Sequence, residues 1–153
     1  MSYPFKNLVF EGGGVKGVAF GGALEVLSKR GIFSQVVRVG GTSAGAITAA
    51  MVALGYDADY IKQEMLALDF NQFKDGNFLS DVTRLFKKYG WYKGDTFLEF
   101  MEGQIATRTG NPDTTFDDLH NAISSENGFR DLYVVGTDLT TRQYQVFSYE
   151  STG

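Results

Sequence analysis

The sequence contains no cysteine, a single histidine and only two prolines among its 153 residues. Without cysteine, the chain cannot form a disulfide framework, a cysteine-based zinc site or a thiol nucleophile. No apolar run approaches the length of a membrane-spanning helix, and the N-terminus lacks the charged and apolar regions of a secretory signal peptide. These absences predict a cytoplasmic protein, although export by another route also agrees with the sequence.

The sequence has fewer basic than acidic residues, with 14 Lys and Arg and 18 Asp and Glu, which gives a net charge of −4. Phosphate backbones are bound by a surplus of basic residues, so we expect no nucleic-acid partner. The hydrophobic share of 43% and the charged share of 21% are typical of an ordered globular protein. Glycine is abundant, at 19 residues, which indicates several positions of close backbone approach.

Short apolar runs alternate with helical patterns in the first part of the chain. Residues 7–10 and 36–39 are mostly apolar, stop close to glycines and are typical of buried parallel strands. Apolar residues at helical spacing occupy 20–27, and residues 44–54 are apolar on nearly every side, which indicates a buried helix. Strand, turn and helix thus follow one another twice, which predicts an α/β fold with a parallel sheet and right-handed crossovers.

The rest of the chain predicts further helices and a pair of strands. We expect helices at 57–68, 95–105 and 116–123, with Asp57 and Asp95 at or near the N-caps of the first two, and strands at 131–136 and 143–147. The sequence stops shortly after the last strand, where an α/β domain does not usually finish. We therefore expect residues 1–153 to be part of a domain, truncated at its C-terminal side.

The strongest motif is GTSAG at residues 41–45, which fits the G-x-S-x-G nucleophile elbow between a strand and a helix. The strained turn lifts the hydroxyl of Ser43 clear of the sheet, and Gly41 and Gly45 let the backbones pass. The helix that starts at Ala44 directs its N–H groups and positive dipole end toward charge that develops during acyl transfer. The alternative is a serine in a tight glycine turn or at a helix N-cap; the flanking strand and helix favour the nucleophile.

The second motif is EGGGVKG at residues 11–17. Gly12, Gly14 and Gly17 also satisfy the dinucleotide pattern G-x-G-x-x-G, but the next strand ends in glycines instead of an acidic ribose-binding residue. A P-loop would need Ser or Thr after Lys16. The remaining interpretation is an anion-binding turn whose N–H groups, including that of Gly13, form an oxyanion hole beside the serine.

Together, the two motifs resemble the patatin-like phospholipase family in order and approximate spacing, and the resemblance continues more weakly through residues 131–147. It implies a three-layer α/β/α sandwich with a mainly parallel sheet. It also implies that Ser43 is the nucleophile and that the Gly12–Gly14 turn is the oxyanion hole. Glu11 and Lys16 stand where the family often has Asp and Arg, and both keep the charge.

The general base is not evident in this sequence. We interpret His120 as an exposed helical histidine, not as a triad member. The resemblance implies instead a Ser–Asp dyad, with the aspartate in a downstream Asp-Gly-Gly or Asp-Gly-Ala turn, and neither tripeptide occurs. Asp75 fits an ordinary turn, and Asp138 fits a structural hydrogen bond. We therefore expect the catalytic aspartate beyond Gly153, and little or no activity from these residues alone.

Aromatic and basic side chains crowd the middle of the chain, at Phe70, Phe73, Phe78, Arg84, Phe86, Lys87, Lys88, Tyr89, Trp91, Tyr92 and Lys93. An interfacial enzyme often has a basic, aromatic rim that contacts lipid head groups. The simpler interpretation is that these aromatics fill the core. Peripheral contact with a membrane surface is therefore a hypothesis that the sequence leaves open.

The sequence as a whole predicts a lipid acyl hydrolase of the phospholipase A or esterase type, without cofactor or metal. Its substrate would be a phospholipid or another fatty-acyl ester, hydrolysed through an acyl-Ser43 intermediate with the N–H groups of the glycine turn and of Ala44 as oxyanion donors. Two alternatives remain. One is a non-catalytic lipid- or acyl-binding module, and the more distant one is a nucleotide- or phosphate-binding protein that uses the first glycine turn.

Overall fold

The computed structural model describes residues 3–68 and 94–151. The chain divides into two compact units, one formed by Met1–Ala67 with Thr114–Gly153 and the other by Leu68–Asp113. The first unit contains the sheet and both glycine motifs. In the second unit, the described part contains helix α5 (Asp95–Thr109).

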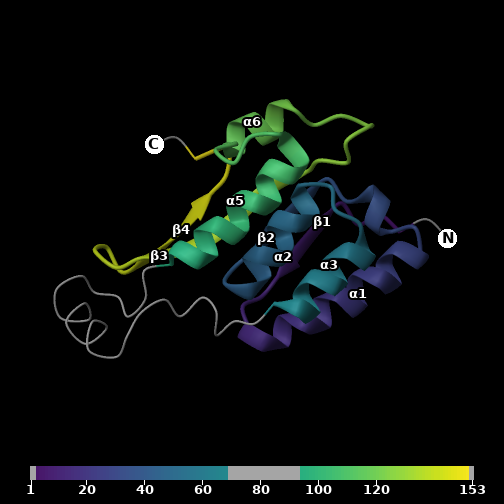
Figure 1. The fold of residues 1–153 in the computed structure, drawn as a ribbon, viewed down its shortest axis with the longest axis horizontal. Coiled ribbons are helices and arrows are strands. Elements are labelled where there is room, and N and C mark those ends of the chain that lie inside the picture. Colours follow the sequence, from purple (N-terminus) through teal and green to yellow (C-terminus); the bar gives the residue numbers. More distant parts are fainter. Residues whose placement is uncertain (1–2, 69–93, 152–153) are drawn as a thin grey trace. The chain divides into compact units, whose positions relative to one another are not determined.

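A four-stranded sheet organises the first unit (Figure 1). Its strands lie in the order β1 (Asn7–Phe10), β2 (Arg38–Gly41), β3 (Asp131–Asp138) and β4 (Gln143–Phe147). The first three are parallel, whereas β4 pairs antiparallel with β3. The predicted α/β class with a mainly parallel sheet is confirmed.

Three helices cover one face of this sheet: α1 (Val18–Lys29), α2 (Ala44–Ala53) and α3 (Ala58–Ala67). Because β1, β2 and β3 follow one another in a single direction, right-handed crossovers place α1 and α2 on the same side. Helix α2 packs on all three parallel strands, and α3 packs against α1. The largest fully buried side chains come from these helices and from β2, at Leu24, Val39, Thr48, Met51, Val52, Ile61 and Met65.

The short helix α6 (Phe116–Asn121) lies against the other face of the sheet. Gly41 faces α2, and its partner on β3 is Val134. Asp131 lies three residues before Val134, so its side chain points to the opposite face. His120 of α6 contacts Asp131 there, with 2.6 Å between Nδ1 and Oδ1. Helices therefore cover both faces, which confirms the layered α/β/α arrangement.

Arg130, the residue before β3, forms hydrogen bonds to the end of α2 and to residues 33–36, which precede β2. It is only 9% exposed, and its guanidinium donates to the carbonyls of Val52 at 2.8 Å, Gly128 at 2.8 Å, Val36 at 3.1 Å and Phe33 at 3.4 Å. Burial lowers the pKa of Arg130. The Val52 carbonyl belongs to the last turn of α2, where the negative end of the helix dipole favours a cation.

Several element boundaries differ from the sequence-based expectation. Strand β2 begins at Arg38, because Val36 is the C-cap of a 3₁₀ helix, η2 (Phe33–Gln35), that the apolar pattern did not predict. A second 3₁₀ helix, η1 (Gly14–Gly17), follows β1. Asp57 caps α3 as expected, with its Oδ1 accepting from the amide of Tyr60 at 2.7 Å.

Two helices of the later part also differ in extent. Asp95 is the first residue of α5 and not its cap, which is Gly94, and the helix continues to Thr109. Helix α6 is shorter than expected, and it begins with a capping box between Thr115 and Asp118. In the described ranges, we find no helix with the length and apolarity needed to cross a bilayer.

Candidate functional site

Ser43 occupies the turn between β2 and α2 in a strained conformation. Its φ of 53° and ψ of −130° fall in a region that residues with a side chain rarely adopt, at a cost of about 1–3 kcal/mol. The residue is exposed and stands at the N-cap of α2, but its side chain makes no capping hydrogen bond. Among the described residues, its hydroxyl has no hydrogen-bond partner. The geometry therefore disfavours the N-cap alternative.

The flanking glycines allow the backbone to fold this tightly. A Cβ atom added to Gly41 would lie 2.3 Å from the Gly45 carbonyl oxygen. One added to Gly45 would lie 2.3 Å from the Phe10 oxygen and 2.5 Å from the Glu11 oxygen. These separations are far below van der Waals contact. Only glycine fits at either position, and β1 passes directly against the start of α2.

The two glycine-rich bends converge in space. A Cβ atom on Gly12 would lie 3.1 Å from the Cβ of Ser43 and 3.4 Å from the Thr42 oxygen. The Thr42 amide also donates to the Phe10 carbonyl at 3.3 Å, which joins the end of β1 to the elbow. The carboxyl ends of β1 and β2 thus bring the glycine turn beside the serine, as expected for adjacent parallel strands.

The remaining motif glycines shape the turn around Gly12. Gly14 has a φ of 55°, in the left-handed region that favours glycine, and starts η1. The carbonyl of Gly13 accepts from the amide of Lys16 at 3.2 Å. Gly17 is buried, and a Cβ atom there would lie 3.2 Å from the Cβ of Ala44. The glycine turn therefore contacts the elbow at both of its ends.

Ser43 stands at the start of α2, and the glycine turn that leads into η1 lies beside it at Gly12. Gly14 begins η1 and Ala44 begins α2, and the first N–H groups of a helix have no partner within it. The positive end of the α2 dipole adds to this field. Such an arrangement can bind an anion or stabilise a developing oxyanion. The catalytic role of Ser43 and the donor roles of Gly12, Gly13, Gly14 and Ala44 stay predictions.

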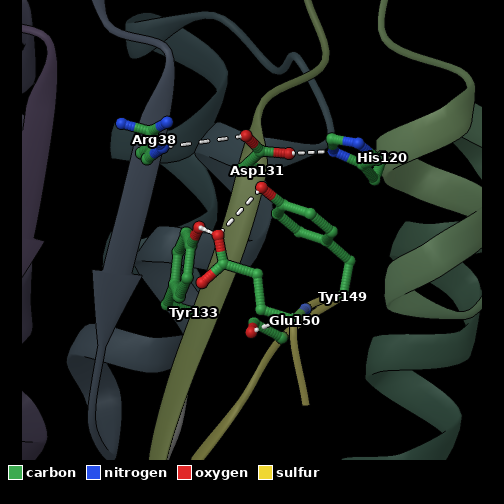
Figure 2. A network of polar contacts seen from close by, with 7 residues as sticks. Arg38, His120, Asp131, Tyr133, Tyr149 and Glu150 are labelled. Atoms are coloured by element: carbon green, nitrogen blue, oxygen red, sulfur yellow. Dashed lines mark hydrogen bonds and ion pairs between the residues drawn. The ribbon is translucent and has the colours of Figure 1, made fainter. Parts of the chain in front are cut away.

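The only histidine lies at the other end of the sheet (Figure 2). His120 stacks on Tyr149 with a ring-centroid distance of 3.8 Å, and its Nδ1 lies 2.6 Å from Oδ1 of Asp131. Asp131 and Arg38 are the first residues of β3 and β2, whereas Ser43 follows the last residue of β2. About 10 Å of strand separates these ends, so His120 cannot complete a triad with Ser43.

The histidine nevertheless differs from the exposed, isolated side chain that the sequence suggested. It joins a polar network in which the Tyr149 hydroxyl donates to Oε1 of Glu150 at 3.0 Å and the Tyr133 hydroxyl does so at 3.2 Å. The Glu150 carboxylate raises the pKa of Tyr149. Sequence spacing gave no sign of this network, because its members come from α6, β3 and the segment after β4.

Asp138, the candidate carboxylate that the structure describes, forms no hydrogen bond with Ser43. Asp138 accepts from the amide of Thr140 and the hydroxyl of Thr141, both at 2.8 Å, and these bonds, the Thr141 hydroxyl first, lower the pKa of Asp138. The predicted structural hydrogen bond is thus confirmed. Asp75 and the aromatic and basic cluster at 70–93 lie outside the described residues. Within the described part, no three potential metal ligands gather.

Comparison with known proteins finds a family and several relatives of this chain. The sequence model of a family described as patatin-like phospholipase matches residues 8–152. Protein R571 of Acanthamoeba polyphaga mimivirus is 30% identical over 144 residues, which make up 94% of this chain and 45% of that protein. Protein YqhO of Bacillus subtilis (strain 168) is 40% identical over 99 residues, or 61% of this chain and 33% of that protein.

The fold also resembles a solved structure. The crystal structure of VipD from Legionella pneumophila matches with a TM-score of 0.68 and 22% identity, covering 99% of this chain and 40% of that one. At this identity the similarity concerns the fold alone. The chain spans less than half the length of each of these three relatives.

Proposed function

The chain belongs to the patatin-like phospholipase family, and on this premise we propose that it provides the nucleophile and oxyanion hole of a lipid acyl hydrolase. The reaction is of the phospholipase A or esterase type and uses no metal or cofactor. Its substrate is a phospholipid or another fatty-acyl ester. A cytoplasmic location and peripheral contact with a membrane surface stay predictions.

One observation carries this proposal: the glycine turn lies against an exposed serine whose hydroxyl has no hydrogen-bond partner among the described residues. Gly12 and Ser43 approach so closely that a single added Cβ atom would lie 3.1 Å from the serine Cβ. Ser43 keeps a costly backbone conformation, and its hydroxyl is not used for helix capping. Strain of this kind persists at functional sites, because the surrounding structure enforces it.

In the proposed reaction, Oγ of Ser43 attacks the ester carbonyl carbon while a base takes the hydroxyl proton. The carbonyl oxygen becomes an oxyanion, which accepts hydrogen bonds from N–H groups of the Gly12–Gly14 turn and of Ala44. The intermediate then expels the alcohol, which receives the proton from the base, and the acyl group stays on Ser43. Water attacks this acyl-serine, the base takes its proton, and the fatty acid leaves as the hydroxyl is restored.

We infer that the base is an aspartate outside the 153 residues. In the described part, the Ser43 hydroxyl has no partner, and His120 lies at the far end of the strands. A serine hydroxyl without a base is a poor nucleophile. Residues 1–153 would then be one part of a patatin-like domain, with little or no activity alone. The greater length of the relatives supports this inference.

A Ser43→Ala variant of the full-length protein tests the proposal. We expect hydrolysis of a p-nitrophenyl acyl ester to fall by at least about 10⁴-fold, because the acyl acceptor is gone. Labelling of the protein by a fluorophosphonate should disappear with it. His120→Asn is the control, and it should leave both rates unchanged.

Two results would contradict the proposal. Ester hydrolysis that survives Ser43→Ala would remove the nucleophile role, and hydrolysis that is lost in His120→Asn would point to another base. A third result concerns the base alone: residues 1–153 hydrolysing the ester at a rate that Ser43→Ala abolishes would place the base within this sequence.

A non-catalytic lipid- or acyl-binding module is the second candidate. The observation that favours it is that the Ser43 hydroxyl has no hydrogen-bond partner among the described residues. Such a module would bind fatty-acyl chains, but its serine would not react with a fluorophosphonate. Binding of a fluorescent fatty acid without labelling of the wild-type protein would therefore support the module.

A further inference from the structure

A buried junction between α2 and α3 adjoins the elbow. Met65 of α3 is 1% exposed and Thr48 of α2 is fully buried. The Thr48 hydroxyl lies 3.2 Å from the Ala44 carbonyl oxygen and 3.7 Å from Sδ of Met65. Ala44 directly follows Ser43 in the chain. The junction therefore begins at the first turn of the helix that carries the serine.

The same methionine reaches the end of the glycine turn. A Cβ atom on Gly17 would lie 3.1 Å from Cε of Met65 and 3.2 Å from Cβ of Ala44. Gly17 is the last residue of η1. The Met65 methyl group thus lies beside the end of η1, where η1 approaches the start of α2, while its sulfur contacts Thr48 of α2.

From these contacts we propose that Met65 and Thr48 are positioning residues that fix the distance between the glycine turn and Ser43. The inference rests on the proposed function. Methionine is long and unbranched and fills irregular gaps, so the length of its side chain sets how closely η1 and α2 approach. The Thr48 hydroxyl bonds to the Ala44 carbonyl one turn earlier and also contacts Sδ of Met65, so it links the first turn of α2 to the methionine of α3.

The expected effect is kinetic, because oxyanion donors act only at about 2.7–3.1 Å from the developing charge. A change of a few tenths of an ångström between the two bends should slow acylation and leave substrate binding unchanged. Ordinary core packing would instead lower stability without a selective effect on catalysis. Met51 offers a matched control, since it is also a fully buried methionine but lies about two helical turns beyond Ala44 in α2.

The kinetic experiment compares Met65→Leu, Thr48→Val and Met51→Leu in the product of the complete reading frame. We expect the first two to lower kcat for an acyl ester by about tenfold or more, with KM unchanged. Met51→Leu should keep kcat, although its melting temperature falls as far as that of Met65→Leu. Equal kcat losses in both methionine variants, or a rise in KM alone, would overturn the inference.

A second measurement needs no catalytic activity and therefore separates this inference from the proposed function. In protein with ¹⁵N-labelled glycine, Met65→Leu should shift the amide resonances of Gly12–Gly14 and speed their hydrogen exchange, whereas Met51→Leu should not. If the wild type neither hydrolyses esters nor reacts with a fluorophosphonate, the proposed function fails. The positioning role of Met65 is then tested by these resonances alone. Unmoved glycine resonances in Met65→Leu would reject the positioning role.

Discussion

At the residue scale, the site depends on how closely glycines let other backbone segments approach Ser43. Gly41 and Gly45 meet carbonyl oxygens that would lie 2.3 Å from an added Cβ atom, so neither tolerates a side chain. Gly12 is different, because its added Cβ atom would lie 3.1 Å from a side-chain carbon of Ser43. The first two glycines are thus required by the fold, whereas Gly12 permits the close approach of the two bends.

A Gly12→Ala variant should therefore separate folding from reactivity. The new methyl group needs a shift of a few tenths of an ångström between the glycine turn and Ser43, which the surface-exposed turn can make. We expect fluorophosphonate labelling of Ser43 to slow by about 10–100-fold, because the oxyanion donors move. The labelling rate and the melting temperature are measured on the same sample.

Gly22→Ala is the matched control on the exposed side of α1, where an added Cβ atom meets nothing within 4 Å. It should leave the labelling rate unchanged and stabilise the protein by about 0.5–1 kcal/mol, since alanine favours the helix over glycine. If Gly12→Ala labels as fast as the control does, the turn does not act on Ser43.

The sequence predicts these residues because local motifs place them. Glycines two positions before and after Ser43 are a steric requirement of the elbow, and this requirement can be read from spacing alone. Met65 and the pairing of His120 with Asp131 could not be predicted in this way. Their partners come from other elements, so the contacts depend on how the elements pack and not on the spacing along the chain.

At the element scale, α2 is held at both ends. Its first turn meets β1 and the glycine turn, and the carbonyls of its last turn accept hydrogen bonds from Arg130. No carboxylate among the described residues pairs with this buried guanidinium. The carbonyl groups and the helix dipole therefore stabilise its charge.

Replacement of Arg130 by methionine should strongly destabilise the fold. The change keeps much of the apolar stem but leaves the carbonyl groups of Val36 and Gly128 without a donor, and we expect a loss of about 2–4 kcal/mol in the free energy of unfolding. Arg38→Met removes a long ion pair of 3.9 Å between a half-exposed Arg38 and Asp131 and should cost less than about 1 kcal/mol. Denaturant titration measures both, and equal losses would show that the carbonyl contacts of Arg130 contribute little.

The pair of helices α1 and α3 should respond to acid through Glu25. Hydrogen bonds from Lys29 and then Lys62 lower the pKa of Glu25 to about 2 from its ordinary value of 4.5. Because the carboxylate is favoured in the folded state, its stabilisation is complete above pH 4.5 and is lost as the pH falls toward 2. The contribution is modest, because the pair is largely exposed to solvent.

We therefore expect the melting temperature of Glu25→Gln to change less than that of the wild type between pH 4.5 and 2. Glu126→Gln is the control, since Glu126 is exposed and forms no ion pair with the described residues. Parallel acid profiles for wild type and Glu25→Gln would contradict this expectation.

Periodicity predicted the position of strand β1 and of helix α2, but the expectation that β1 is buried is wrong, because only Phe10 of this strand is buried. Strand β1 matches the expected residues, and α2 ends one residue before its expected end. The two 3₁₀ helices were not predicted, because glycine-rich and mixed segments carry no clear period. Strand β2 was displaced for the same reason, since Val36 is buried without being part of the strand.

At the scale of the whole molecule, two adjacent parallel strands provide both halves of the candidate site. The order β1-β2-β3-β4 puts the carboxyl ends of β1 and β2 next to each other, so each glycine bend lies at the same edge. This arrangement follows from the strand–turn–helix pattern and was predictable. The sequence does not identify the residue that acts as the base, because neither Asp-Gly-Gly nor Asp-Gly-Ala occurs in it, and the aspartate of the dyad stays a prediction.

The most direct measurement is a crystal structure of the protein after reaction with a fluorophosphonate. Its phosphonyl oxygen occupies the place of the oxyanion in acyl transfer. We predict a covalent bond to Oγ of Ser43 and hydrogen bonds of about 2.7–3.1 Å from N–H groups of the Gly12–Gly14 turn to that oxygen. An adduct on another residue, or a phosphonyl oxygen turned away from these N–H groups, would contradict the proposed site.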